Sequence, residues 1–310
     1  MPIAPSPSDV LRFLSGHGAE SVLVTLVHIE GSASRAVGTQ LAVAADGSHC
    51  GSLSGGCIDA AIVAEALEVL ALGHGQGVGR QVRFGTGSRY LDLKLPCGGG
   101  MDLLFTPRPD PAIIAAALGS LEQRRGFAMA IGPDGIASAE AGAGPASQHF
   151  VRHYAPPLRL IAIGQGDELA ALVRLAADFG AEVVAVMPQE QVQDLPVAVL
   201  PVKSRDTLPS LTGDPWTAIL FLFHDRDWEE FLLPQALALQ GFYHGAIGSP
   251  ATQAQRRQRL EASAVPPADL AKLRAKVGLI PSTRDPATLA LSLLAEVVGD
   301  YAVLVARGAR

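Results

Sequence analysis

LRLIAIGQGDELAALVRLAADFGAEVVAVM, residues 158–187, is the stretch of sequence that decides the fold. The apolar run 158–164 is typical of a buried strand, and 168–180 has the apolar spacing of a helix closed by glycine. A second β-branched run follows at 181–187. Strand, helix and strand in this order form the repeating unit of a parallel sheet. The stretch therefore predicts a Rossmann-like domain.

The same alternation continues toward the C-terminus. A strand is predicted at 216–223, a helix at 227–240 and a further strand within 241–248. Helices at 250–263, 267–277 and 285–306 complete the chain. We therefore predict that residues 158–310 form a doubly wound parallel-sheet domain.

The first half of the chain has a different order of predicted strands and helices. A long β-branched run at 21–31 predicts a strand, Asp46-Gly47 predicts a hairpin, and 57–73 has helical spacing. Three short strands follow in QVRFGTG, LDLKLPC and MDLLFTP, so residues 1–107 are expected to form an N-terminal α+β domain. The overall class is α/β. Residues 108–157 are expected to connect the domains through a helix (111–124), a hairpin at 133–135 and an Ala-, Gly- and Pro-rich linker (141–157).

Composition excludes several classes of protein. The net charge of −6 argues against a partner that is nucleic acid, because phosphate binding needs a basic face. No stretch approaches the ~18 apolar residues of a membrane span, and the N-terminus lacks the regions of a signal peptide. With three cysteines a disulfide framework is not expected. We expect a cytoplasmic protein without a membrane partner.

A glycine turn follows the first strand of the Rossmann-like half. Gly164 and Gly166 would let backbone N–H groups approach a phosphate at the start of the helix. However, Leu169 occupies the third fingerprint position, and Met187 stands where a ribose-binding acid is expected. Asp167 adds a repelling charge. NAD(P) is therefore not expected to bind, and the alternative is that the glycines serve only the tight turn.

Two further glycine-rich segments contain cysteine. Ser54, Gly55 and Gly56 precede Cys57 at the start of a helix, where free N–H groups could bind an anion or Ser54 could merely cap the helix. Cys97 precedes Gly98 and Gly99, so its thiol could face an open cavity and serve a soft metal or sulfur transfer. The alternative is a small buried cysteine in a turn. Cys50 is interpreted as structural.

Polar residues at other strand ends remain open to two interpretations. Arg35 could form a forked contact with phosphate, or be a solvated loop residue. His224 and Asp225 follow an apolar strand, where histidine could titrate or bind metal, while Asp225 or Asp227 could simply cap the next helix. The segment 245–249 could form another turn that faces an anion, or only a bend.

The order of these motifs is recognisable. The segments EGSASRAVGTQ (30–40), SGGCIDAA (54–61), LPCGGGMDLLF (95–105), FHDRD (223–227), HGAIGSPATQAQRRQRL (244–260) and DPATLALSLLAE (285–296) follow one another along nearly the whole chain. Together with the GQG turn they resemble the XdhC/CoxI family of xanthine dehydrogenase accessory proteins.

The resemblance implies a function. Family members bind molybdenum cofactor, protect it during sulfuration and deliver it to an apo molybdenum hydroxylase, so a carrier is expected rather than an enzyme with its own turnover. The cofactor would be the plain molybdopterin form or a dinucleotide form. A cysteine desulfurase-type sulfurtransferase is a further implied partner, and a homodimer is the default assembly. Alternatives are an NAD(P)-binding oxidoreductase, or a scaffold that docks the sulfurtransferase to the apo-hydroxylase.

The resemblance also implies site residues. Cys97 and Cys57 are the expected metal or sulfur ligands, with Cys97 preferred, and their two turns are expected to converge into one receptacle. The remaining cofactor-binding residues are expected to be Ser32, Arg35, Ser54, Gly55, Gly56, Gly98, Gly99, Gly164, Gly166, His224 and Asp225. The chain departs from the family pattern at Asp167, where histidine is common, at Met187, where aspartate is common, and at 278–282, where G-L-D-I-G is common.

Overall fold

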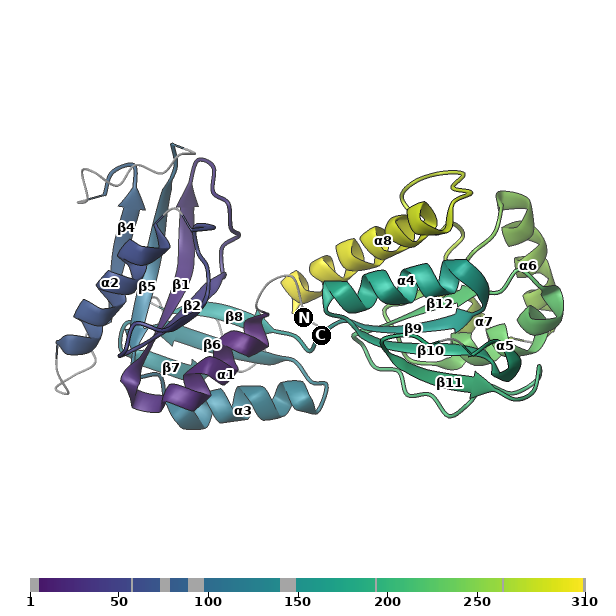
Figure 1. Cartoon of the computed structure of the whole chain (residues 1–310), viewed down its shortest axis with the longest axis horizontal. Coiled ribbons are helices and arrows are strands. Elements are labelled where there is room, and N and C mark those ends of the chain that lie inside the picture. The colour runs from purple at the N-terminus through teal and green to yellow at the C-terminus, as the bar shows by residue number, and fades with distance from the viewer. Residues whose placement is uncertain are drawn as a thin grey trace. The chain divides into compact units, whose positions relative to one another are not determined.

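The structure is a computed structural model that describes residues 6–56, 58–72, 79–88, 98–139, 149–192, 194–263 and 265–308. The chain divides into two compact units, Ala4–Ala155 and Pro156–Arg310 (Figure 1). Each unit has its own apolar clusters, and no cluster of described residues contains side chains from both.

The first unit is built on an antiparallel sheet with the strand order β3-β2-β1-β5-β4. The predicted hairpin is confirmed, with Gly47 at a φ of 82° between β2 and β3. The strand predicted at 91–97 lies outside the described residues. The strands are β1 (Ser21–Glu30), β2 (Gln40–Ala44), β3 (His49–Gly51), β4 (Arg80–Gly85) and β5 (Gly100–Pro107).

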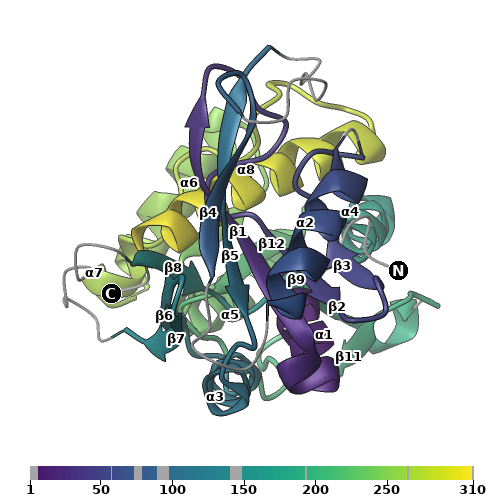
Figure 2. The ribbon, with the colours of Figure 1, turned by 90° about the vertical axis from the view of Figure 1, so that its left-hand side faces the viewer.

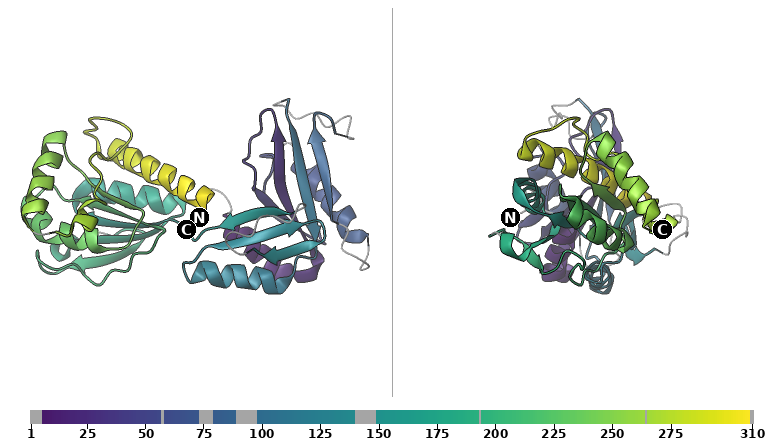
Figure 3. Two further views of the ribbon diagram at one scale, coloured as in Figure 1. Left: turned by 180° about the vertical axis from the view of Figure 1, so that it is seen from behind. Right: turned by 90° about the vertical axis from the view of Figure 1, so that its right-hand side faces the viewer.

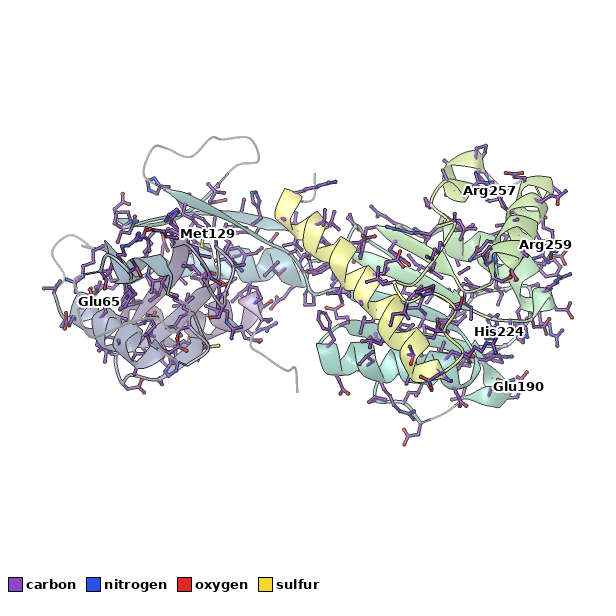
Figure 4. The ribbon with its side chains drawn as sticks, turned by 90° about the horizontal axis from the view of Figure 1, so that it is seen from above. Glu65, Met129, Glu190, His224, Arg257 and Arg259 are labelled. Carbon is purple, nitrogen blue, oxygen red and sulfur yellow. The ribbon has the colours of Figure 1, made fainter. Side chains whose placement is uncertain are left out.

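Helices cover both faces of this sheet. Helix α2 (Asp59–Ala71) packs on one face through its apolar side, and its buried Glu65 accepts a hydrogen bond of 2.7 Å from Arg80 Nε of β4 (Figure 4). Helices α1 (Pro7–His17) and α3 (Pro111–Glu122) pack together in the cluster on the other face, and a 3-10 turn, η1 (Gly18–Glu20), leads from α1 into β1. The predicted helices at 57–73 and 111–124 are thus confirmed within a few residues of each end.

A small sheet completes the first unit. Its strands, in the order β7-β6-β8, are β6 (Phe127–Gly132), β7 (Gly135–Ser138) and β8 (Phe150–Tyr154). The buried Tyr154 hydroxyl donates a hydrogen bond of 2.8 Å to Gln40 Oε1, and Gln40 in turn donates to Thr25 Oγ1, so β8 is tied to the first sheet. The expectation that 141–157 is linker is therefore wrong for 150–154, because burial of Tyr154 and Met129 makes this segment part of the core.

The second unit has the predicted parallel sheet, with the strand order β11-β10-β9-β12-β13. Its strands are β9 (Arg159–Gly164), β10 (Glu182–Pro188), β11 (Ala198–Val202), β12 (Thr217–Leu222) and β13 (Tyr243–Ala246). Its helical segments are α4 (Gly166–Phe179), η2 (Gln189–Gln191), α5 (Arg226–Ala238), α6 (Pro250–Ala262), α7 (Pro267–Leu270) and α8 (Pro286–Arg307). Strand β11 was not predicted, and the helix predicted at 267–277 is limited to α7.

The sheet of the second unit is covered on both faces. Helices α4 and α8 pack on one face, and α5, α6 and α7 pack on the other (Figure 3). Because both faces are buried, β9 and β12 are continuous apolar runs after their first residues, Arg159 and Thr217, rather than alternating, which is why their sequences were easy to recognise.

Helix α8 is long enough and apolar enough to cross a membrane by length and composition, so the expectation that no stretch approaches a span was wrong on this criterion. Its Leu293, Leu294 and Val297 pack in the core of the second unit against α4. An apolar core helix passes the same test of composition.

A buried ion pair links α5, α6 and the end of β13. The Arg256 side chain is 1% exposed, and its Nη2 donates to Glu229 Oε2 at 2.9 Å and to the Ile247 carbonyl oxygen at 2.8 Å. Arg259 donates to the other oxygen of Glu229 at 2.9 Å. Removing one member of such a pair leaves an uncompensated buried charge.

We therefore expect Arg256→Met to destabilise the second unit by about 3 kcal/mol or more. Both tryptophans, Trp216 and Trp228, belong to this unit, so tryptophan fluorescence during urea unfolding reports on it alone. Arg257→Met is the control, since Arg257 is exposed and, among the described residues, pairs only with Glu261 in the next turn. Equal midpoints for the two variants would contradict the prediction.

Candidate functional site

The motif residues of the first unit gather at one edge of its sheet. Strand pairing places Glu30 opposite Gly100, and Gly85 opposite the same residue, so β1 and β4 end where β5 begins. The pairing of Leu41 with Gly51 places the end of β3 at the start of β2, and β2 begins opposite Thr25, in the middle of β1. Figure 2 shows β1, β4 and β5 side by side. The segments that carry the motifs therefore leave the sheet from the same edge.

The turn after β1 contacts the glycines before β5. A Cβ atom on Gly99 would lie 2.4 Å from the Ser32 carbonyl oxygen, so only glycine allows this close approach of two backbones. Thr86 donates from its hydroxyl to the Gly98 carbonyl at 3.0 Å and from its N–H to the Gly99 carbonyl at 3.1 Å. Ser32, Gly98 and Gly99, which come from two separate motifs, are thus brought together by the fold, and Gly99 has a clear packing role.

The Ser54 turn is adjacent to Arg35. The exposed Arg35 side chain donates from Nε to the Ser52 carbonyl oxygen at 3.3 Å. This contact joins the loop after β1 to the loop after β3. The guanidinium still exposes its remaining nitrogens, so neither the phosphate-binding interpretation nor the solvated one is decided by the contact.

The turn before α2 holds its own carboxylate. Asp59 accepts hydrogen bonds from the Ser52 and Ser54 hydroxyls at 2.6 and 2.7 Å and from the Leu53, Ser54 and Gly56 N–H groups at 3.2, 3.0 and 3.1 Å. The Gly55 N–H donates to Ser52 Oγ at 3.0 Å. The expectation of free N–H groups at Ser54, Gly55 and Gly56 was therefore wrong, because Asp59 occupies the position an anion would take.

Ser54 is not the N-cap of α2, since that position is Ile58, and the capping interpretation of Ser54 is therefore wrong. Its hydroxyl oxygen accepts from the Ile58 N–H at 3.0 Å while its proton is donated to Asp59, so it joins the turn to the residue that precedes α2. Burial acts to raise the pKa of Asp59, but the hydrogen bonds from Ser52, Ser54 and Leu53 outweigh it and hold the pKa below its ordinary range.

The two cysteines predicted as ligands, Cys57 and Cys97, lie outside the described residues, so the predicted convergence of their turns stays a prediction. Cys50 is half-buried against the apolar cluster to which α1 contributes side chains. This burial raises the pKa of its thiol. A protonated, half-buried thiol agrees with a structural role. No group of three or more metal-ligating side chains occurs among the residues that the structure describes.

In the second unit, the glycine turn lies where the strand order changes direction. Gly164 is buried against β12, and a Cβ atom there would lie 2.8 Å from Leu222 Cβ. Gly166 begins α4 with a φ of 79°, which favours glycine. Met187 is fully buried at the end of β10. These contacts account for both glycines by packing and by the tight turn.

His224 lies at the same edge of the sheet. Its Nε2 is 3.3 Å from Glu168 Oε1 of α4, and its side chain is 67% exposed (Figure 4). Asp225 accepts from the Asp227 N–H at 2.9 Å and caps α5. The capping interpretation of Asp225 is therefore confirmed. His224 remains available at an edge where ligands of α/β proteins bind.

Beside His224 the second unit contains a cavity of about 890 Å³. It lies at the carboxyl edge of the sheet, between the segments that follow β12 and β13 and the segment 275–289. Its apolar lining includes Phe223, Ile247, Val277, Ile280 and Leu289. Its size is within the range of small-molecule sites in proteins.

The charged side chains that line this cavity are mostly cationic. Glu229 is the only carboxylate among its described lining residues, whereas the cationic side chains are Arg226, Arg256, Arg259, Lys276 and Arg284. The sequence predicted His224 and the 245–249 turn at this edge, but it did not predict these cations. The available signal was the basic run after the turn, in QAQRRQR (253–259).

Family models match both units. The model described as the XdhC and CoxI family matches residues 15–85, and the model described as the XdhC Rossmann domain matches residues 160–297. The molybdenum cofactor insertion chaperone PaoD of Escherichia coli (strain K12) is 36% identical over 297 residues, covering 93% of this chain and 86% of that protein. The chain belongs to the XdhC and CoxI family.

A solved structure supports the fold of this family member. A crystal structure described as a xanthine dehydrogenase from Bacillus halodurans matches 99% of this chain and 97% of that chain, with a TM-score of 0.74 and 21% sequence identity. At this identity the match shows the fold alone. It agrees with the predicted α/β class and the Rossmann-like second half.

The Asp59 turn leads to a pH-dependent prediction. Because the pKa of Asp59 is lowered in the folded chain, the stabilisation it provides is present at neutral pH and is lost as pH falls below about 4. Asp59→Asn should therefore speed hydrogen exchange of the Ser54 and Gly56 amides about tenfold or more at pH 7, through loss of charge-assisted hydrogen bonds.

The difference between the variant and the parent protein should shrink only as the parent is acidified below that pH, where Asp59 takes up a proton. NMR-detected hydrogen exchange measures both effects. Asp46→Asn is the control, because within the part of the chain that the structure describes the Asp46 side chain hydrogen-bonds only Ser48 of its own hairpin. Unchanged exchange at Ser54 and Gly56 in Asp59→Asn would show that the carboxylate does not order the turn.

Proposed function

We propose that the chain binds molybdenum cofactor and inserts it into an apo molybdenum hydroxylase of the xanthine dehydrogenase type. The observation that supports this most directly is the 36% identity, along 93% of the chain, with a protein named as a molybdenum cofactor insertion chaperone. Membership of the XdhC and CoxI family supports the same function.

The chemistry of the cargo agrees with features of the chain. Molybdenum cofactor is an anionic, phosphorylated pterin that holds its metal through a dithiolene and is unstable in water. A carrier needs cations or N–H groups for the phosphate and an enclosed apolar surface for the ring system. The cavity of the second unit combines a cationic lining with apolar walls in one space of about 890 Å³.

The motif segments of the first unit have a different role in this proposal. The thiols of these segments, Cys97 above all and Cys57, are proposed to contact molybdenum or to pass on sulfur received from a cysteine desulfurase-type sulfurtransferase. Thiolate is a suitable ligand for a soft metal centre. Since Asp59 occupies the N–H groups of the Ser54 turn, that turn serves to order the segment preceding α2. A homodimer and the dinucleotide form of the cofactor are further parts of the proposal.

An NAD(P)-dependent oxidoreductase is not favoured. The buried Met187 leaves no acid at the end of β10 for a ribose hydroxyl. Asp167 and Glu168 place negative charge in the first turn of α4, where a pyrophosphate would need to bind.

Cofactor retention tests the proposed function. The purified chain is incubated with molybdenum cofactor under anaerobic conditions and desalted, and molybdenum and pterin are quantified in the protein fraction. We expect both to co-elute with the chain in a fixed ratio, and bovine serum albumin at the same concentration to retain neither. If neither co-elutes with the chain, the remaining candidate is the scaffold that docks a sulfurtransferase without holding cofactor.

The thiol part of the proposal has its own test. Cys57→Ser with Cys97→Ser should abolish activation of the apo-hydroxylase by the loaded chain, because serine binds molybdenum and carries sulfur poorly. Cys50→Ser is the matched control, since Cys50 is half-buried in a strand and its thiol is held protonated. Full activation by the double variant would show that the thiols are not needed for delivery, and the proposal of cofactor binding would stand unchanged.

A further inference from the structure

We propose that the cavity of the second unit is a phosphate-binding site, and that the phosphate is held at the N-terminus of α6 by Ser249, Lys276 and Arg284. The ligand class is a phosphorylated organic molecule whose ring system packs on the apolar wall. Only the identification of that ligand with molybdenum cofactor depends on the proposed function. The phosphate site itself is argued from the geometry and charge of this unit.

The charges at the helix starts single out α6. Helices α4, α5 and α6 all begin at the carboxyl edge of the parallel sheet, where each directs its first N–H groups outward. The first turn of α4 contains Asp167 and Glu168, and that of α5 contains Asp227 and Glu229. The first turn of α6 contains no acidic residue. Among these helices, an anion is therefore favoured at α6.

The start of α6 is shaped for close approach. Ser249 caps the helix by accepting the Thr252 N–H at 3.2 Å, and its backbone carbonyl accepts the Gln253 N–H at 2.9 Å. Pro250 has no N–H, and no hydrogen bond among the described residues engages the N–H of Ala251. Gly248 has a φ of 152°, and a Cβ atom there would lie 2.9 Å from Thr252. Ser249 Oγ also lies 2.9 Å from Thr252 Oγ1, and when Thr252 is the donor of that pair the Ser249 proton is free for a phosphate. The Ala251 N–H is the second group that α6 offers.

Cations without partners face the same cavity. Lys276 and Arg284 line it, and neither forms an ion pair or hydrogen bond with any residue in the described parts of the chain. Arg226 also lines it and donates only to the amide oxygen of Gln255, at 3.0 Å. In contrast, Arg256 and Arg259 are compensated by Glu229. The uncompensated charge in the cavity is therefore positive, in a chain whose net charge is −6.

The Arg256 guanidinium forms part of the cavity wall beside these cations. Its side chain is 1% exposed and is held in place by Glu229, Gln253 and the Ile247 carbonyl oxygen. A Cβ atom on Gly248 would lie 3.5 Å from Arg256 Nη1, so this guanidinium lies directly beneath the start of α6.

The apolar wall accounts for the rest of the ligand. Phe223, Ile247, Val277, Ile280 and Leu289 line the cavity beside its cations. An inorganic ion alone would need no such wall, whereas a phosphorylated heterocycle would bury its ring there. The site therefore fits a ligand that has a phosphate at one end and a flat apolar body at the other.

Calorimetric titration with inorganic pyrophosphate tests the site without any cofactor. We expect the parent chain to bind it, with an affinity that falls as salt rises. Lys276→Gln combined with Arg284→Gln should weaken binding at least tenfold, because the two substitutions remove the unpaired cations. The control pair, Lys203→Gln with Arg257→Gln, removes the same charge from exposed positions of the same unit outside the cavity lining, and should change affinity less than twofold.

Arg257 is a suitable control position because it lies on another side of α6 than the cavity-lining Arg259. The two residues are two positions apart in the helix, so their side chains project from different sides (Figure 4). Thermal unfolding of both double variants checks the fold. If the cavity variant unfolds at a lower temperature than its control, pyrophosphate affinity is compared for the single Arg284→Gln variant instead.

The outcomes separate this proposal from the proposed function. Absence of pyrophosphate binding by the parent chain, or equal affinities for the cavity and control variants, would overturn the phosphate site. Retention of molybdenum and pterin is then measured on the same variants. If the cavity variant retains molybdenum and pterin fully, the chain is a cofactor carrier that binds the phosphate of the cofactor outside this cavity. Loss of retention in the cavity variant alone would support both proposals.

Discussion

The buried guanidinium of Arg256 is the interaction on which the architecture of the candidate cavity depends. It contacts the carbonyl of Ile247 at the end of β13, the carboxylate of Glu229 on α5 and the side-chain oxygen of Gln253 on its own helix. A charge in an interior is stable only when its hydrogen bonds are nearly complete. Its partners therefore fix how α5 and α6 begin at the edge of the sheet, and with them the floor of the cavity.

The fold could be predicted from the sequence wherever local pattern and burial agree. β9 and β12 are buried on both faces, so their sequences are continuous apolar runs that only a central strand explains. β11 was missed because it is an edge strand, half-exposed and interrupted by Pro201. The short strand β8 was missed because the Ala-, Gly- and Pro-rich stretch before it suggested linker, while the burial of Tyr154 depends on contacts with residues more than one hundred positions away.

The candidate site could be predicted only in part, for a related reason. The motifs showed which turns are rich in glycine, but the contact of Ser32 with Gly99, which lie in two separate motifs, was not foreseen. No local pattern shows whether an N–H group is already bonded, so the role of Asp59 in the Ser54 turn was not foreseen. The cations of the cavity come from separate segments, and only the tertiary fold assembles them.

The division of apolar clusters between Ala4–Ala155 and Pro156–Arg310 has an evolutionary consequence. A substitution in one core changes the folding free energy of that unit and leaves the packing of the other untouched. Mutations can therefore accumulate at different rates in the thiol-bearing half and in the half with the cationic cavity. A lineage that adapts to a new cargo or a new recipient can alter one half while selection preserves the other.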